Sequence, residues 1–161
     1  MYEPAEDTFM LLECCKSLKN KTILEIGCGT GIISKYLLKS NKVMSTDINP
    51  LVVKYCKSHK LNVIQSDLFE NIKDKFDYII FNPPYLPKDK EDNDITLYDK
   101  NIIPRFLKQA KSHLNKNGKI LIIWSSLNNY KPLLKKLKYK FKTIKTEKFF
   151  FETLEVLECK N

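Results

Sequence analysis

The stretch from Lys21 to Gly31 reads KTILEIGCGTG, a short apolar run followed by three closely spaced glycines. The apolar run predicts a buried strand, and the residues from Gly31 to Lys39 place apolar side chains at helical spacing. Glycines between a strand and a helix let the backbone approach a ligand and open the N-terminus of the helix toward it. This stretch therefore predicts an α/β unit that binds a nucleoside.

The rest of the chain continues the alternation of strands and helices. Further strands are expected at 42–47, 61–65, 76–81, 119–124, 139–145 and 149–158, and further helices at 7–17, 50–60, 102–114 and 129–138. This alternation predicts a mainly parallel sheet with helices on both faces. The last two strands have a short connection and alternate apolar with polar residues, which predicts an antiparallel hairpin at one edge. The helix before the fifth strand is expected to end near Asn117-Gly118.

Length and composition favour a single globular domain over 1–161. The chain has 161 residues, of which 43% are hydrophobic and 29% are charged. No apolar run approaches the ~20 residues that span a bilayer, and the acidic start of the chain is unlike a signal peptide. The five cysteines include no C-x-x-C pair. We therefore expect reduced thiols, no metal site, no membrane association, and a cytosolic or nuclear location.

The charge of the chain does not by itself identify a partner. The net charge of +9 comes almost entirely from lysine, and Arg105 is the only arginine. A protein that specifically binds phosphate groups usually contains several arginines, because the guanidinium group binds phosphate with two hydrogen bonds. The lysine-rich segment 131–148 can steer an acidic or RNA-associated partner, but it is equally consistent with a solvated surface.

Two groups of apolar side chains outside the central strands are expected to join the core. In the first helix they are Phe9, Leu11, Leu12 and Cys15, which share one helical face. The second group is the aromatic run Phe149-Phe150-Phe151 near the start of the last strand.

The residues around the glycines narrow the choice of nucleoside. Asp47 ends the second strand twenty residues after Gly27, where a carboxylate can accept hydrogen bonds from both ribose hydroxyls. The dinucleotide fingerprint G-x-G-x-x-G would need glycine at position 32, which is Ile32. The loop from Gly27 to Gly31 contains no lysine or arginine to bind a pyrophosphate. A nucleoside other than a dinucleotide is therefore expected.

The tetrapeptide Asn82-Pro83-Pro84-Tyr85 directly follows the fourth strand. Open α/β sheets bind ligands at the carboxyl ends of their strands, so this segment should face the cofactor. The Asn82 side chain and the Pro83 backbone each offer a carbonyl, the prolines stiffen the turn, and the Tyr85 ring can stack on a planar group. These groups suit a flat substrate that bears an NH2, with catalysis mainly by orientation.

The glycine loop resembles the first motif of class I S-adenosylmethionine-dependent methyltransferases, which implies a Rossmann-like fold with a seven-stranded, mostly parallel sheet. In that family the acidic residue that opens the motif and the glycines line the methionine part of the cofactor. The residue like Asp47 holds the ribose, and an Asp after the third strand contacts the adenine amino group. The corresponding positions here are Glu25, Gly27, Gly29, Gly31, Asp47 and the pair Asp67-Leu68.

Two further motifs narrow the resemblance to one branch. Asn82-Pro83-Pro84-Tyr85 resembles the methyltransferases that modify glutamine amides or adenine N6, and 2–8 (YEPAEDT) resembles the start of the catalytic domain in the eukaryotic and archaeal HemK-type class. The resemblance implies that Thr8 touches the cofactor, together with Asn82. It also implies a catalytic subunit that methylates the glutamine of the Gly-Gly-Gln loop in a class I translation termination factor. The extra N-terminal substrate-binding domain of bacterial relatives is not expected.

The resemblance also implies a small zinc-binding activator subunit. By the same resemblance the third strand lies at a sheet edge, and its residues from Leu61 to Gln65 are uncharged. Edge strands normally carry charge or proline, so an unprotected edge invites pairing with another chain. We therefore expect the segment 61–66 to bind the activator.

Other functions remain open at this stage. The tetrapeptide and the positive charge also suit an adenine N6-methyltransferase acting on RNA or DNA, although the single arginine argues against nucleic-acid specificity. A protein lysine methyltransferase or a scaffold that binds the cofactor without catalysis is also possible from the residues alone. The polar loop 86–99 is expected to be mobile.

Overall fold

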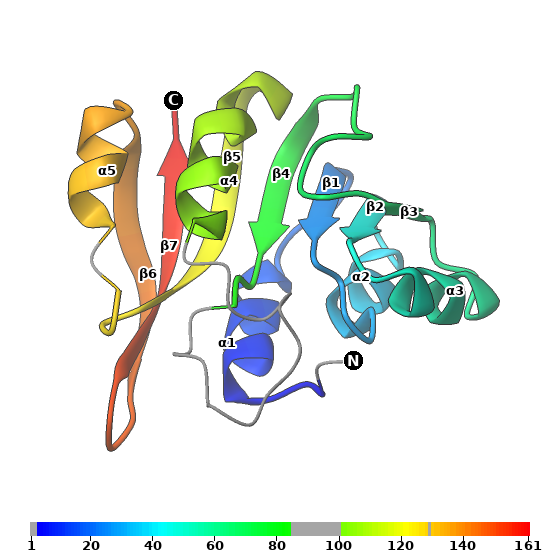
Figure 1. Cartoon of the computed structure of the whole chain (residues 1–161), viewed down its shortest axis with the longest axis horizontal. Coiled ribbons are helices and arrows are strands. Elements are labelled where there is room, and N and C mark those ends of the chain that lie inside the picture. Colours follow the sequence, from blue (N-terminus) through cyan, green and yellow to red (C-terminus); the bar gives the residue numbers. More distant parts are fainter. Residues whose placement is uncertain (1–2, 85–100, 129) are drawn as a thin grey trace.

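The computed structural model describes residues 3–84, 101–128 and 130–161, and it contains one seven-stranded sheet with the order β3-β2-β1-β4-β5-β7-β6 (Figure 1). Neighbouring strands from β3 to β5 pair in parallel, whereas β7 pairs antiparallel with both β5 and β6. The predicted Rossmann-like sheet with an antiparallel C-terminal hairpin is confirmed. The strands are β1 Thr22–Ile26, β2 Lys42–Asp47, β3 Val63–Gln65, β4 Phe76–Phe81, β5 Leu114–Ser125, β6 Lys140–Lys148 and β7 Thr153–Lys160.

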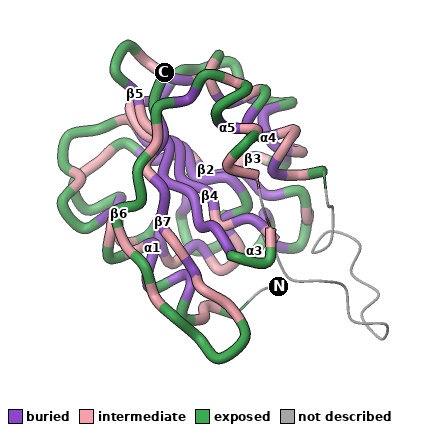
Figure 2. Tube along the Cα trace, turned by 90° about the vertical axis from the view of Figure 1, so that its left-hand side faces the viewer, coloured by how far each residue is buried: buried purple, intermediate pink, exposed green. Residues whose placement is uncertain are grey.

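Helices cover both faces of this sheet, as predicted. One face packs against α4 and α5, with Phe106 and Leu134 fully buried; the other packs against α1 and α2, with Leu11 and Leu37 buried. Figure 2 shows the buried residues concentrated along the central strands. In the described ranges, no helix combines the length and the apolar character needed to cross a membrane. The helices are α1 Glu6–Cys15, α2 Ile32–Leu37, α3 Pro50–Ser58, α4 Ile102–Ala110 and α5 Lys131–Lys136, and Lys111–His113 forms a 3-10 turn.

The alternation of side chains along β4 determines which face each residue serves. Ile79 and Phe81 pack in the cluster that includes α4, whereas Ile80 packs in the cluster that includes α1. The next residue, Asn82, then turns toward α1, because successive side chains of a strand point to opposite faces. Ile26 of β1 lies opposite Phe81 of β4, so Gly27 and Asn82 leave neighbouring strands at the same level.

The fifth strand begins earlier than the sequence predicted. The prediction placed the end of a helix at Asn117-Gly118, but α4 ends at Ala110 and β5 starts at Leu114, opposite Phe76 of β4. Asn117 has φ +66°, and a Cβ on Gly118 would lie 2.9 Å from a backbone oxygen of β4. The Asn-Gly pair therefore forms an irregularity inside a strand, where the register against β4 shifts, and the prediction was wrong.

The core predictions for two apolar groups were wrong in part. Leu11 and Cys15 are buried as expected, but the Phe9 side chain is 52% exposed. In the aromatic run at the turn between β6 and β7, Phe150 is 94% and Phe151 84% exposed. Figure 2 shows that this hairpin extends away from the buried strands, which explains why its tip finds no core to join.

Candidate active site

The glycine loop after β1 adopts a conformation that strongly favours glycine. Gly27, Gly29 and Gly31 have φ of +65°, +53° and +71°, in the left-handed region that other residues rarely adopt. A Cβ on Gly31 would also collide with the Leu61 side chain and would lie 3.3 Å from the Cys56 sulfur. The three predicted glycines thus shape a tight loop that leads directly into α2.

Glu25 links β1 to the first turn of α2. One of its carboxylate oxygens, Oε2, accepts hydrogen bonds from the Ser34 backbone N–H (3.0 Å) and from the Ser34 hydroxyl, which lies 2.6 Å from the Ser45 hydroxyl of β2. Burial raises the pKa of Glu25 to about 7. A carboxylate in this state gains from a nearby cation, because a positive charge favours its ionised form.

Asp47 lies where the sequence predicted, against the glycine loop. Its Oδ2 accepts the Gly29 backbone N–H at 3.1 Å, and its Oδ1 accepts the Asn49 backbone N–H at 2.9 Å. Burial raises the pKa of this carboxyl group, although the two backbone hydrogen bonds oppose the shift. The structure therefore brings the predicted ribose acceptor and the glycines together at the carboxyl ends of β1 and β2.

Asp67 follows β3, and it has a partner that the sequence did not predict. Its Oδ2 lies 2.6 Å from Nη2 of Arg105, the only arginine of the chain, which comes from α4. Both side chains are partly exposed, so this ion pair stands at the surface beside the ends of the strands. The neighbouring Leu68 is buried and has φ +51°.

Asn82 contacts the first turn of α1. Its side-chain nitrogen donates to Oδ2 of Asp7 (3.1 Å) and to the Thr8 hydroxyl (3.4 Å). Its side-chain oxygen Oδ1 is buried and has no hydrogen-bond partner in the described part of the chain. A buried acceptor without a partner costs about 1–3 kcal/mol, so it marks a position where a ligand donor is expected.

The other predicted residues of this region have different outcomes. Thr8 is buried and its hydroxyl contacts Asn82, whereas its predicted contact with the cofactor stays a prediction; Pro83 is also buried. Tyr85 and the loop 86–99 lie outside the described residues. The sequence reasoning missed Asp7, although it lies next to Thr8 in the quoted YEPAEDT segment.

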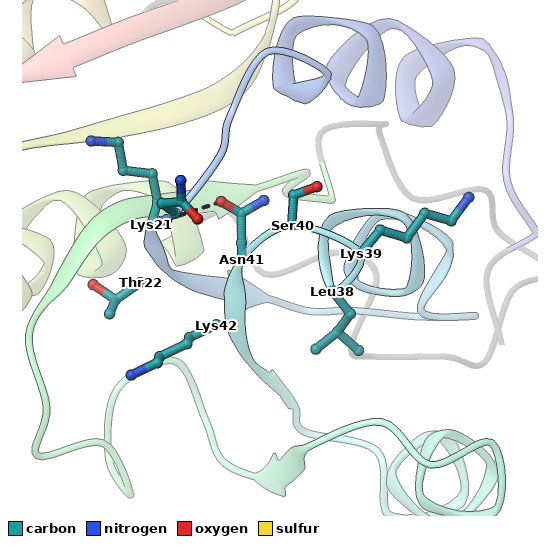
Figure 3. Close-up of a pocket in the computed structure, with 8 residues that line it drawn as sticks. Lys21, Thr22, Leu38, Lys39, Ser40, Asn41 and Lys42 are labelled. Carbon is teal, nitrogen blue, oxygen red and sulfur yellow. Dashed lines mark hydrogen bonds between the residues drawn. The ribbon is translucent and has the colours of Figure 1, made fainter.

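A separate pocket lies at the amino ends of the parallel strands, away from the glycine loop at their carboxyl ends. It has a volume of about 490 Å³ and is lined by residues at the amino ends of β1 and β2 (Figure 3). The Asn41 side chain there accepts the Lys21 backbone N–H and donates to the carbonyls of Leu18 and Leu37. These groups hold the turn between α2 and β2 together, and none of the predicted site residues lines this pocket.

Comparison with known proteins identifies the family. The model of the methyltransferase small domain matches residues 5–152. The chain belongs to this methyltransferase family. A Methanocaldococcus jannaschii protein, provisionally named a protein N5-glutamine methyltransferase, is 41% identical over 99% of this chain and 91% of its own length. A ribosomal RNA small subunit methyltransferase C of Pseudoalteromonas translucida is 35% identical over 88% of the chain, which spans 42% of that protein.

Solved methyltransferase structures share the fold. The E. cuniculi Mtq2-Trm112 complex, responsible for methylation of the eRF1 translation termination factor, matches with a TM-score of 0.82 and 28% identity over 99% of this chain and 98% of that one. The T. thermophilus 16S rRNA N2 G1207 methyltransferase, solved with AdoMet and guanosine, has a TM-score of 0.74 at 19% identity, over 99% of this chain and 44% of that one. The prediction of a HemK-type class I methyltransferase is confirmed.

The site of this methyltransferase fits its cofactor, S-adenosylmethionine. The glycine loop brings bare backbone to the carboxyl ends of the strands, and the buried Asp47 carboxylate, which was predicted to accept ribose hydroxyls, lies beside it. The loop carries no cation that a pyrophosphate would need. These features agree with a nucleoside that carries a positively charged sulfur rather than phosphates.

Proposed function

We propose that this methyltransferase modifies the side-chain nitrogen of a glutamine, and that this glutamine belongs to the Gly-Gly-Gln loop of a class I translation termination factor. The observation that carries the proposal is the buried Oδ1 of Asn82, an acceptor without a partner next to the glycine loop. A primary amide brings the N–H donor that this oxygen lacks. The M. jannaschii relative and the Mtq2-Trm112 neighbour support the choice of a glutamine and of a termination factor.

In this proposal the chain acts mainly by orientation. When bound, S-adenosylmethionine would supply an electrophilic methyl group: its C–S bond would break as the N–C bond forms, S-adenosylhomocysteine would leave, and the amide nitrogen would lose a proton after the transfer. Asn82 Oδ1 accepts one N–H of the substrate amide, the Pro83 carbonyl accepts the other, and the Tyr85 ring packs against the amide plane. Fixing a nucleophile in this way removes the entropic cost of aligning it, which can contribute several kcal/mol to catalysis.

The cofactor is held by residues from several strand ends. Glu25 faces the amino group of the methionine part, since its buried carboxylate gains from a cation. Gly27, Gly29 and Gly31 line the methionine part, and Asp47 accepts the ribose hydroxyls. Thr8 and Asn82 border the cofactor from the other side, and the pair Asp67-Leu68 holds the adenine.

Mass spectrometry tests this function directly. The chain and its activator are incubated with labelled S-adenosylmethionine and one of three substrates: a termination factor, RNA, or histone. We expect a single methyl group on the glutamine of the Gly-Gly-Gln loop. Asn82→Ala should abolish transfer yet leave the Kd for the cofactor nearly unchanged, since the Asn82 side chain is proposed to hold the substrate amide and only borders the cofactor, whose main contacts are the glycine loop and Asp47. Methylation of RNA or of histone lysine alone would refute the proposal.

Methylation of an exocyclic amine in RNA is the second candidate. The ribosomal RNA relatives support it, and the T. thermophilus neighbour acts on a guanine N2, which is also an NH2 on a planar group. The same buried acceptor on Asn82 would serve a base amine. However, the chain spans less than half of the length of these relatives, so the comparison with them covers only part of each RNA methyltransferase.

We further propose that a small zinc-binding subunit pairs with the segment 61–66. Within the described residues, β3 is an edge strand that pairs only with β2. The hydrogen bonds to β2 use the Asn62 carbonyl and the Ser66 N–H, so the N–H groups of Val63 and Gln65 face away from β2. The Val63 side chain itself is buried beside α3, so a lysine there would disturb the core rather than test the edge.

Gln65 provides a cleaner test of this edge. Gln65→Pro removes the outward N–H, whereas Gln65→Ala removes the side chain and keeps the N–H. Co-purification with the activator should fail for the proline variant and persist for the alanine variant. Equal recovery of both complexes would exclude pairing at β3.

A further inference from the structure

The orientation of the Asn82 amide is fixed by its neighbours. A side-chain amide presents oxygen on one side and nitrogen on the other, so a half-turn exchanges an acceptor for a donor. Asn82 Nδ2 lies 3.1 Å from a carboxylate oxygen of Asp7. A carboxylate only accepts hydrogen bonds, so the nitrogen must face Asp7 and the oxygen must face the other way. In the reverse orientation two oxygens would meet in a buried place.

Asp7 is in turn held in a single position. Its second oxygen, Oδ1, accepts the Thr8 backbone N–H at 2.5 Å and the Thr8 hydroxyl at 3.2 Å. The Asp7 side chain is buried, and it lies in the first turn of α1, where the helix dipole favours negative charge. Because the Thr8 hydroxyl donates to Asp7, only its lone pairs remain for Asn82 Nδ2. In the hydrogen-bond network of these three side chains, each donor and each acceptor therefore has a fixed place.

We propose that Asp7 is a positioning residue for methyl transfer: it fixes the Asn82 amide so that its oxygen, and not its nitrogen, meets the NH2 of the substrate. This inference rests on the proposed amide substrate. A reversed Asn82 would present N–H groups to the N–H groups of the substrate, so it could not hold the nucleophile. Asp7 would then select for a substrate nitrogen that donates hydrogen bonds.

The isosteric variant Asp7→Asn separates this role from a structural one. Thr8 N–H still needs an acceptor, so the oxygen of the new side chain is expected to face Thr8 and its NH2 to face residue 82. Asn82 then turns its oxygen toward position 7 and its nitrogen toward the substrate. Loss of one hydrogen bond to the reacting group predicts a decrease in kcat/KM of ~10–100-fold, with the cofactor Kd within about twofold of wild type.

Glu6→Gln is the matched control. Glu6 precedes Asp7 in the same helical turn and is exposed, so this variant changes the same charge at the same helix N-terminus without touching Asn82. Its kcat/KM should stay within about twofold of wild type. An equal loss in both variants would show that charge at the helix N-terminus, and not amide orientation, controls the rate, and would overturn the proposal.

Exchanging the two side chains provides a rescue test. In the double variant Asp7→Asn with Asn82→Asp, Asn at 7 donates to one carboxylate oxygen at 82 and leaves the other oxygen for the substrate. Asn82→Asp alone places two carboxylates together and should be slow. We expect the exchange to recover at least ~10-fold of the loss seen in the slower single variant. If Asp7→Asn does not fold, the kcat/KM of the double variant is compared with that of Asn82→Asp alone. A double variant that is no faster than Asn82→Asp would refute the proposal.

Nuclear magnetic resonance can detect the orientation of the Asn82 side-chain amide in the absence of substrate. In the wild-type protein with S-adenosylmethionine bound, the Asn82 NH2 protons should exchange slowly with water, because one of them is bonded to Asp7. Their signals should shift and exchange faster in Asp7→Asn but not in Glu6→Gln. If wild type methylates no glutamine yet this pattern appears, the proposed function fails and the orienting role of Asp7 survives. Unchanged signals in Asp7→Asn refute that role.

Discussion

Replacing the buried acid of the glycine loop should change how the stability of the protein depends on pH. Glu25 is buried, and burial raises its pKa from an ordinary value of 4.5 to about 7. Glu25→Gln keeps the size of the side chain and an oxygen that can accept from Ser34, but it removes the titrating group. Comparing the two proteins across pH therefore isolates the energetic effect of burying this carboxyl group.

The sign and the magnitude follow from the direction of the shift. The folded protein binds the Glu25 proton more tightly than the unfolded chain, so the resulting stabilisation is complete below pH 4.5 and is lost as the pH rises through 7. A shift of this size corresponds to about 3 kcal/mol in total, since each pKa unit is worth about 1.4 kcal/mol. Between pH 5 and 8, wild type should lose about 2–3 kcal/mol relative to Glu25→Gln.

Urea unfolding followed by circular dichroism at pH 5, 6, 7 and 8 measures this difference. Asp77 supplies a control of opposite sign, because a hydrogen bond from the Thr22 backbone lowers its pKa. Its stabilisation is present above pH 3.8 and is lost only as the pH falls below that value, so the effect of Asp77→Asn should be constant from pH 5 to 8. A constant difference between wild type and Glu25→Gln over the same range would refute the reasoning.

Two further predictions concern the glycine loop and the surface ion pair. Gly31→Ala should destabilise the protein by about 2–4 kcal/mol in urea unfolding, because it combines a left-handed φ with a collision against Leu61. Gly27→Ala meets only one ring carbon at 3.8 Å and should destabilise the protein by about 1–2 kcal/mol. Equal losses of stability in the two variants would contradict the role of Leu61. Arg105→Ala should change the free energy of unfolding by at most about 1 kcal/mol, because the ion pair is partly exposed. It should raise the cofactor Kd roughly fivefold in calorimetry, since Asp67 is no longer held in place. An unchanged Kd would show that this ion pair does not contribute to adenine binding.

The parts of the fold and site that depend on local sequence could be predicted. Continuous apolar runs in β1, β4 and β5 identified buried parallel strands, and the glycines identified the loop between β1 and α2, where all three have a positive φ. The Asn-Gly pair at 117–118 could not be assigned in the same way. An Asn-Gly pair can end a helix or bend a strand, and the pairing of Leu114 with β4, which no local pattern encodes, decided between the two.

The contacts between distant segments could not be predicted. Asp7 and Asn82 are 75 positions apart, and they meet because the alternation along β4 turns Asn82 toward the helix face that begins with α1. Asp67 and Arg105 are 38 positions apart and come from different layers of the fold. The exposure of Phe150 and Phe151 likewise depends on how far the last hairpin extends past the core.

The buried polar side chains of this site differ in whether they have a hydrogen-bond partner within the protein. Glu25 and Asp47 are buried, and each accepts a hydrogen bond from a segment outside its own strand. Asp7 is also buried and accepts hydrogen bonds from its neighbour Thr8 within α1. These side chains are therefore fixed before any ligand arrives. Among the buried side-chain nitrogen and oxygen atoms of the described ranges, only Thr46 Oγ1 and Asn82 Oδ1 lack a partner. Thr46 lies within β2, but Asn82 lies just beyond the end of β4, where parallel sheets bind ligands. An acceptor left unpaired there lowers the stability of the free protein. In the proposed function, a hydrogen bond from the substrate N–H group would recover this free energy as binding affinity.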